Sequence, residues 1–252
     1  MRVIRIGLTP VKGGRHVARP DVELGPHGAV GDRVLCLVDP ATDRVLRTVR
    51  HPELLRTAPA LTGDRLTVEL DGATVTGTLP GTGEARKVDY WGRQVEVELL
   101  DGPWADFYAR VTGEQVALAR VLEPAGVVFG GGVSIVLTSS LHALSARVGA
   151  PVAGERFRPT FVVDSGDERR GRETTWAGRE ITVGDAVLRI RGAVPRCAVV
   201  DLDPVSARAD LPVLRALSGY GQTDREPYFG VDADVVRPGH VTTGDAFVLG
   251  RS

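Results

Sequence analysis

The sequence predicts a β-rich α+β fold. The first hundred residues consist largely of short, apolar, β-branched segments, and turn residues such as those at 69–73 (ELDGA) and 79–83 (LPGTG) separate them. Helical periodicity is confined to a few later segments, and strand and helix do not alternate regularly. Closely spaced short strands are typical of barrels and sandwiches. Strands, then a helix, then further strands favour α+β over a doubly wound fold.

The strands expected in the first half follow from alternating or β-branched patterns. They lie at residues 3–11, 30–39, 64–70, 73–79 and 94–100. Residues 103–122 then predict a helical turn or two around 105–111, followed by another strand. The next segment, 123–132, is the weakest connection in the chain. It is expected to divide an N-terminal β-rich part, 1–122, from a C-terminal part, 123–252.

The second half predicts an apolar strand at 130–140 and a helix at 139–149, with Ser139 or Ser140 as N-cap. Before that strand, the glycine run at 130–132 is expected to be a flexible turn. Further strands are expected at 157–164, 179–190 and 197–203, a helix near 211–221, and closing strands at 229–236 and 245–250. The charged segment at 171–175 is expected to form a mobile loop.

Composition excludes several classes of function. The 252 residues carry a net charge of −1, so a general basic surface for nucleic acid is not expected. No apolar run approaches the roughly 20 residues that span a bilayer, and no membrane partner is expected. Two distant cysteines cannot form a disulfide framework, and no basic-apolar leader opens the sequence. We therefore expect a cytoplasmic protein.

Several familiar site patterns are missing from the sequence. The five histidines form no HxH or HExxH spacing, so a zinc site made by protein ligands alone is not expected. The glycine run is not followed by GK[ST], no GxGxxG opens a helix, and no serine lies in GxSxG. Nucleotide loops and nucleophile elbows are therefore not predicted.

A set of cationic residues indicates a local anion site. Lys12 is one of only two lysines and begins a Gly-Gly turn in TPVKGGR, where Gly13 allows close approach of the backbone and Arg15 adds charge. On this stretch alone, a solvated hairpin tip is equally compatible. Other arginines lie at strand ends, where each alone is typical of a surface, yet a phosphorylated ligand needs several forked donors. These are Arg33, Arg50, Arg158 and Arg196.

The two cysteines lie in different settings. Cys36 is inside an apolar strand and is expected to be a buried, inert thiol. Cys197 follows Pro195 and Arg196, and a thiol beside a guanidinium is poised to become a thiolate. A thiolate is either a nucleophile or a soft metal ligand, and the residue pattern alone leaves both open.

Separated motifs in both halves of the chain carry a family resemblance. The segments ERFRPTFVVDSG, WAGREITVGDAVLRI, PRCAVVDLDP and FGVDADVVRPGHVTTGDAFVL resemble the MOSC domain, which is named after the C-terminal part of molybdenum cofactor sulfurases. The segments TPVKGGR, GDRVLCLVD and VRHPELL resemble the β-barrel segment that precedes MOSC in the amidoxime-reducing component family. The resemblance covers nearly the whole chain. It implies a MOSC-type β-barrel core with a few flanking helices and an N-terminal β-barrel subdomain.

The resemblance also implies a molybdenum cofactor, a molybdopterin held between the two parts, with Cys197 as the thiolate bound to molybdenum. The positions implied to bind the pterin and its phosphate are Lys12, Gly13, Arg33, Arg50, Arg158, Thr160 and Arg196. Thr160 stands where the family usually has asparagine and donates only one hydrogen bond. The acidic residues expected directly before Trp176 are replaced by Thr174 and Thr175. Thr138, Ser139 and Ser140 either add neutral donors to the cofactor or only cap the helix.

The function implied is reduction of small N-hydroxylated or N-oxide compounds at molybdenum. Electrons would come from a separate protein, a ferredoxin or flavin reductase, since an iron–sulfur cluster needs four cysteines. Asp164, Asp201 and Asp203 lie near the motifs, where either proton relay or turn formation is open to them. One alternative is a sulfur carrier with a persulfide on Cys197, without pyridoxal phosphate, and another is a non-catalytic cofactor binder.

Overall fold

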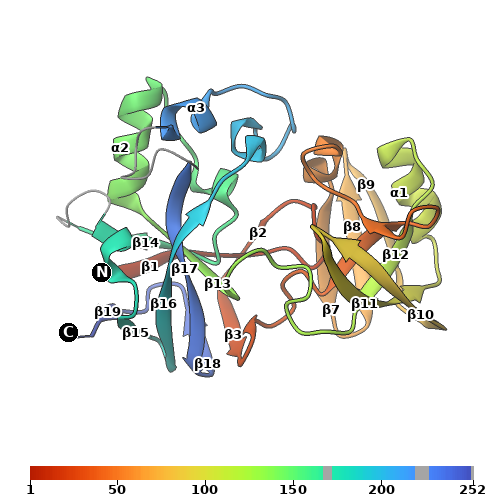
Figure 1. The fold of residues 1–252 in the computed structure, drawn as a ribbon, viewed down its shortest axis with the longest axis horizontal. Coiled ribbons are helices and arrows are strands. Elements are labelled where there is room, and N and C mark those ends of the chain that lie inside the picture. The colour runs from red at the N-terminus through yellow and green to blue at the C-terminus, as the bar shows by residue number, and fades with distance from the viewer. Residues whose placement is uncertain (167–171, 219–226, 251–252) are drawn as a thin grey trace.

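The computed structural model describes residues 1–166, 172–218 and 227–250. Figure 1 shows two lobes side by side. One is built on a large sheet with helices α2 (Thr138–Val148) and α3 (Val213–Leu217) at one end, and the other on a barrel with helix α1 (Trp104–Thr112). The predicted β-rich α+β fold with a barrel is confirmed, as are the helices around 105–111 and 139–149.

The larger lobe contains an eight-stranded sheet with the order β19-β15-β16-β17-β13-β14-β1-β2. Its strands are β1 (Arg2–Leu8), β2 (Val17–Arg19), β13 (Val133–Leu137), β14 (Phe161–Asp164), β15 (Glu180–Val183), β16 (Ala186–Pro195), β17 (Tyr228–Arg237) and β19 (Phe247–Leu249). A smaller sheet joins β18 (Gly239–Thr242), β3 (Asp21–Gly25) and β4 (Gly28–Ala29).

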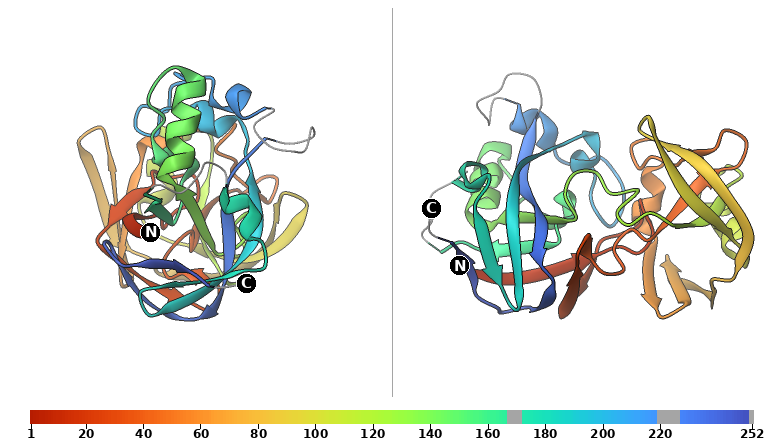
Figure 2. Two further views of the ribbon diagram at one scale, coloured as in Figure 1. Left: turned by 90° about the vertical axis from the view of Figure 1, so that its left-hand side faces the viewer. Right: turned by 60° about the horizontal axis from the view of Figure 1, so that its bottom comes forward.

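Strand β1 pairs antiparallel with β14, which places Ile6 opposite Phe161. Figure 2 shows β1, in red, passing the C-terminal strands and leading towards the barrel lobe. Strands β1 to β4, the last of which ends at Ala29, therefore lie in the sheets of the lobe that the C-terminal half builds. The division at residues 122 and 123 stays a prediction, and the sheets run across it.

The smaller lobe contains a closed five-stranded barrel and a three-stranded sheet. The barrel strands are β5 (Leu35–Asp39), β6 (Arg44–Val45), β10 (Gly81–Tyr90), β11 (Arg93–Leu100) and β12 (Ala117–Val121). The added sheet consists of β7 (Ala58–Thr62), β8 (Arg65–Leu70) and β9 (Ala73–Thr78). Leu66 and Val68 of β8 pack with Trp104 and Tyr108 of α1 in one apolar cluster, which closes this end of the lobe.

Short helices complete the fold. They are the 3-10 helices Pro52–Arg56, Gly154–Phe157, Arg172–Trp176 and Ala198–Asp201. The helix expected near 211–221 is found as α3, while residues 219–221 lie outside the described part of the chain. Within the described residues, no helix combines the length and apolarity needed to cross a membrane.

The expected N-cap of α2 is wrong. The helix begins at Thr138, after Leu137, so neither Ser139 nor Ser140 precedes it. The hydroxyl of Ser165, beside β14, accepts the Ser139 N–H at 3.1 Å and contacts the Thr138 hydroxyl at 3.3 Å. Because a residue from another segment satisfies an early helical N–H, the helix needs no serine of its own as cap.

Two other local predictions are also wrong. Residues 197–203 are predicted to form a strand, but Ala198–Asp201 is a 3-10 helix. Val200 packs in the apolar cluster formed with helices α2 and α3, and Asp201 accepts the Leu214 N–H at 2.6 Å. In place of a mobile loop, Arg172–Trp176 is a 3-10 helix in which Glu173 is buried and accepts the Ser140 hydroxyl. Gly171 lies outside the described residues.

The glycine run before β13 is not a flexible turn. Gly131 donates its N–H to the Asp232 carboxylate on β17. A Cβ on Gly132 would collide with the carbonyl of His27, and one on Gly28 with the carbonyl of Gly132. The connection from the barrel therefore crosses the β3–β4 hairpin at a point where only glycines fit.

Candidate functional site

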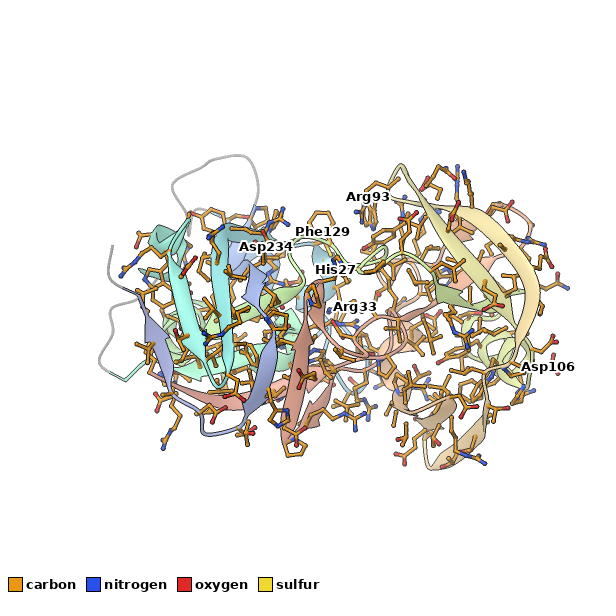
Figure 3. The ribbon with its side chains drawn as sticks, turned by 90° about the horizontal axis from the view of Figure 1, so that it is seen from below. His27, Arg33, Arg93, Asp106, Phe129 and Asp234 are labelled. Carbon is orange, nitrogen blue, oxygen red and sulfur yellow. The ribbon has the colours of Figure 1, made fainter. Side chains whose placement is uncertain are left out.

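A cavity of about 430 Å³ lies between the two lobes. The barrel lobe supplies Tyr90 and Trp91, and the sheet lobe supplies Cys197 and Phe157. Figure 3 labels Phe129 and Arg33, which also line the cavity, at the junction of the lobes. The volume falls within the usual range of ligand pockets, about 300–1,000 Å³.

Cys197 lies two residues after the end of β16, directly before the 3-10 helix Ala198–Asp201. Its side chain is free and exposed, and it lines the cavity. Pro195 ends the strand, and the Arg196 N–H donates to the carbonyl of Pro227 at 2.8 Å. The sulfur is therefore presented to the cavity from a fixed backbone.

Arg196 uses its guanidinium to hold neighbouring segments in place. Its Nε and Nη2 donate to the carbonyl of Phe229 at 2.9 and 2.6 Å, and its Nη1 to the carbonyl of Phe157 at 3.0 Å. Burial lowers the pKa of Arg196 to about 10, and the neighbouring Cys197 partly offsets this. Since the groups that accept from its guanidinium are neutral carbonyls, the arginine keeps its positive charge beside the cysteine.

Arg158 holds the loop that carries Lys12. Its Nη2 donates to the carbonyl of Gly14 at 2.7 Å and its Nη1 to that of Gly13 at 3.4 Å. The carbonyls of both glycines therefore accept hydrogen bonds from Arg158. Burial, followed by the charge of Arg33, lowers the pKa of Arg158 to about 9.

Lys12 lies among these arginines. Burial, followed by the charges of Arg33 and Arg158, lowers its pKa to about 7. Its Nζ lies 4.7 Å from the centre of the Tyr90 ring, a cation–π contact. Arg33 is paired with Asp32, whose other oxygen accepts the Thr9 N–H at 2.9 Å. The cluster carries more positive than negative charge, which favours an anionic ligand.

Of the eight residues predicted for the site, seven line the cavity: Lys12, Gly13, Arg33, Arg158, Thr160, Arg196 and Cys197. Thr160 is buried and braces β13 against the segment before β14, since its hydroxyl accepts the Ser134 N–H at 3.0 Å. Arg50 is exposed and outside the lining, because residues 47–50 form a turn in which the Arg50 N–H donates to the Arg47 carbonyl at 2.9 Å. Arg47 lines the cavity in its place.

Other expected contributors lie elsewhere. Thr138, Ser139 and Ser140 are outside the lining and serve the start of α2. Asp164, Asp201 and Asp203 accept nearby backbone N–H groups and lie outside the lining too.

Sequence reasoning missed five lining residues with distinct chemistry. They are Arg156, Asp232, Tyr90, Trp91 and Phe129. Arg156 is paired with Asp210 through both Nη atoms, at 2.8 and 2.5 Å. Among the described residues that line the cavity, Asp232 is the one acidic residue. The segment DYWGR, 89–93, was the available signal for Tyr90 and Trp91, because two aromatics at a hairpin turn are unusual.

The donor set fits an anionic ligand with many acceptor atoms. Arg158 Nε and Tyr90 Oη are buried and have no hydrogen-bond partner among the described residues, and both residues line the cavity. A buried donor without a partner costs about 1–3 kcal/mol. A phosphate-bearing heterocycle with a soft metal would match the arginines, the lysine and the thiol together.

Family models match nearly the whole chain. Residues 1–115 match the MOSC N-terminal beta barrel domain, and residues 130–248 match the MOSC domain. The chain therefore belongs to the proteins that carry a MOSC domain behind this barrel domain. Members of the MOSC family bind molybdenum cofactor.

Among solved structures, the YuaD protein from Bacillus subtilis is similar over 100% of this chain and 96% of its own, at 14% identity and a TM-score of 0.49. YiiM from Geobacillus stearothermophilus is similar over 48% of this chain and 54% of its own, at 16% identity and a TM-score of 0.35. A Bordetella bronchiseptica protein is similar over 43% of this chain and 91% of its own, at 13% identity and a TM-score of 0.31. No curated protein matches the chain.

Proposed function

We propose that this protein holds molybdenum cofactor in the cavity and reduces small N-hydroxylated or N-oxide compounds. The observation that carries the proposal is an exposed cysteine in a cavity lined by cations with few carboxylates. In this proposal Cys197 is the metal ligand, and the phosphate and pterin are held by Lys12, Arg33 and Arg158. Arg196 keeps a positive charge beside the sulfur, which suits an anionic ligand bound there.

The chemistry supplied by the bound cofactor is a two-electron reduction, in which an N–OH group, two electrons and two protons give N–H and water. The chain's own tasks are to bind, to orient and to deliver protons. We assign proton delivery to Asp232, since its carboxylate lines the cavity and is fixed by the Gly131 N–H. A carboxyl group held there can pass a proton to the departing oxygen.

The electrons come from a separate protein in this proposal. An iron–sulfur cluster needs four cysteine ligands, and the sequence has two cysteines, of which Cys36 is fully buried in the barrel lobe. Burial raises the pKa of the Cys36 thiol to about 12, as expected for an inert cysteine. A ferredoxin or a flavin reductase is therefore the class of partner we expect.

The test is reduction of benzamidoxime with an artificial electron donor, using protein from a host that makes molybdenum cofactor. We expect turnover by the natural sequence. Cys197→Ala should abolish turnover yet retain part of the pterin, because the cationic contacts remain. Full activity of this variant would refute the assignment of Cys197.

A sulfur carrier is the second candidate, and the exposure of the Cys197 thiol is the observation that favours it. In that case the protein would carry a cyanide-labile sulfur on Cys197 and no stoichiometric molybdenum. A non-catalytic binder would contain molybdenum and pterin but leave benzamidoxime unreduced. The same preparation therefore separates all three functions.

A further inference from the structure

Two aromatic side chains are exposed among the described residues, and both line the cavity. Trp91 is 50% exposed and Phe129 is 58% exposed, and no other aromatic residue appears among the exposed large apolar side chains of the described chain. Both line the cavity, together with Val49, which is 44% exposed. These three residues come from three separate segments. Exposed apolar side chains that converge on a cavity mark a ligand surface more strongly than scattered ones.

The backbone conformation of Trp91 is unusual for a bulky residue. Trp91 and Gly92 form the turn between β10 and β11, with φ of 56° and 79°. Glycine and asparagine are the usual residues where a hairpin turn needs positive φ, and a bulky residue there is uncommon. The Arg47 guanidinium lies 4.1 Å from the centre of the indole ring. It covers one face of the ring, so a ligand can contact only the other face or the edge.

Phe129 is fixed relative to this hairpin. Arg93, on the far side of the turn, donates from Nη2 to the carbonyls of Gly126 and Val128, at 3.3 and 3.1 Å. The same guanidinium lies 5.1 Å from the centre of the Tyr90 ring. One arginine therefore links the hairpin that carries Trp91 to the connection that carries Phe129.

We propose that Trp91 and Phe129 bind the flat, apolar body of the substrate, so that the protein prefers N-hydroxylated compounds with an aromatic group. The inference rests on the proposed function, because the cationic residues are assigned to the cofactor and the aromatic residues are left for the substrate. The occupant is a small molecule. A stable protein–protein contact buries about 1,200 Å² or more, whereas this surface consists of two aromatic side chains and a valine.

The other tryptophans make binding directly observable. Trp104 and Trp176 are only 0% and 4% exposed, so iodide quenching of fluorescence reports mainly on Trp91. In cofactor-loaded protein, we expect benzamidoxime to protect Trp91 from iodide at concentrations where acetamidoxime does not. Trp91→Phe should remove the quenchable signal, which confirms its source.

Kinetics give the second measurement. In Trp91→Ala and in Phe129→Ala, we expect the ratio of kcat/KM for benzamidoxime to that for acetamidoxime to fall about tenfold, equivalent to about 1.4 kcal/mol. Val248→Ala is the matched control, since Val248 is an exposed apolar residue of β19 outside the cavity lining. Its ratio should stay unchanged, and the molybdenum content of all three variants should equal that of the natural sequence.

Each other outcome has a definite meaning. If Trp91→Ala loses cofactor, the indole packs on the pterin and the inference is wrong. If amidoximes are reduced but the ratio and the quenching do not respond to either aromatic residue, the inference fails while the proposed function stands. If no amidoxime is reduced and yet benzamidoxime protects Trp91, the proposed function fails and the aromatic surface remains.

Discussion

Arg158 connects the sheet lobe to the loop that carries Lys12, and it does so from a left-handed backbone conformation with φ of 52°. Arg158→Ala removes a charged donor from the proposed phosphate contacts. We expect cofactor affinity to fall by about 1.5–3 kcal/mol, the usual value of a hydrogen bond to a charged group. Arg50→Ala is the matched control, because Arg50 is exposed and outside the lining. Equal pterin content in the two variants would contradict the assignment.

Lys12 gives the protein without cofactor a defined pH dependence. Its pKa is about 7 in the folded chain, below the ordinary value of 10.5, so the unfolded chain binds more protons between these values. The free energy of unfolding should therefore rise with pH above about 7. In Lys12→Met this rise should be smaller, measured by urea unfolding between pH 6 and pH 8, below the pKa of about 9 of Arg158. An equal slope in both proteins would show that Lys12 is not held in this environment.

At the level of residues, the sequence predicted the cationic residues of the cavity better than the other residues that line it. Lys12, Arg33, Arg158 and Arg196 were predictable because each lies in a motif. Arg47 was not, since only the turn at 47–50 decides which of two arginines faces inwards. Trp91 was not predictable either, because it lines the cavity from a hairpin turn, and hydrophobic periodicity does not specify the geometry of that turn.

Among the elements, the glycine connection before β13 determines how the two lobes meet. Gly132→Ala would place a methyl group against the His27 carbonyl on the β3–β4 hairpin. Overpacking of this kind typically costs about 1–3 kcal/mol, and we expect a matching loss in the free energy of unfolding. Gly192→Ala is the control, because nothing lies within 4 Å of the Cβ it would gain. Similar stability of the two variants would mean that the backbone at Gly132 is not packed tightly against the His27 carbonyl.

Element types were largely predictable, and element pairing was not. The alternating pattern at residues 3–11 predicts a strand, and β1 is found there. The pattern cannot reveal that β1 pairs with β14, because that contact joins residues far apart in the sequence. The segment after Cys197 was predicted as a strand because VVDL is β-branched and apolar. Its helical turn follows from tertiary contacts of Val200 and Asp201, which override local propensity.

For the whole molecule, the cavity exists because the chain passes between the lobes more than once. Lys12 and Gly13 lie between β1 and the barrel, and Phe129 lies on the return connection. Cys197 comes from the sheet lobe and Trp91 from the barrel. The site therefore depends on both lobes, because Cys197 and Trp91 come from different lobes and Lys12 comes from the connection between them.

The molybdenum and pterin content of the protein, purified from a host that makes the cofactor, tests most directly whether Cys197 and the surrounding cations hold the cofactor. We predict close to one molybdenum and one pterin per chain, with the molybdenum strongly reduced in Cys197→Ala. Protein that contains neither, or that retains molybdenum fully in Cys197→Ala, would contradict the claim that Cys197 and the surrounding cations hold a molybdenum cofactor.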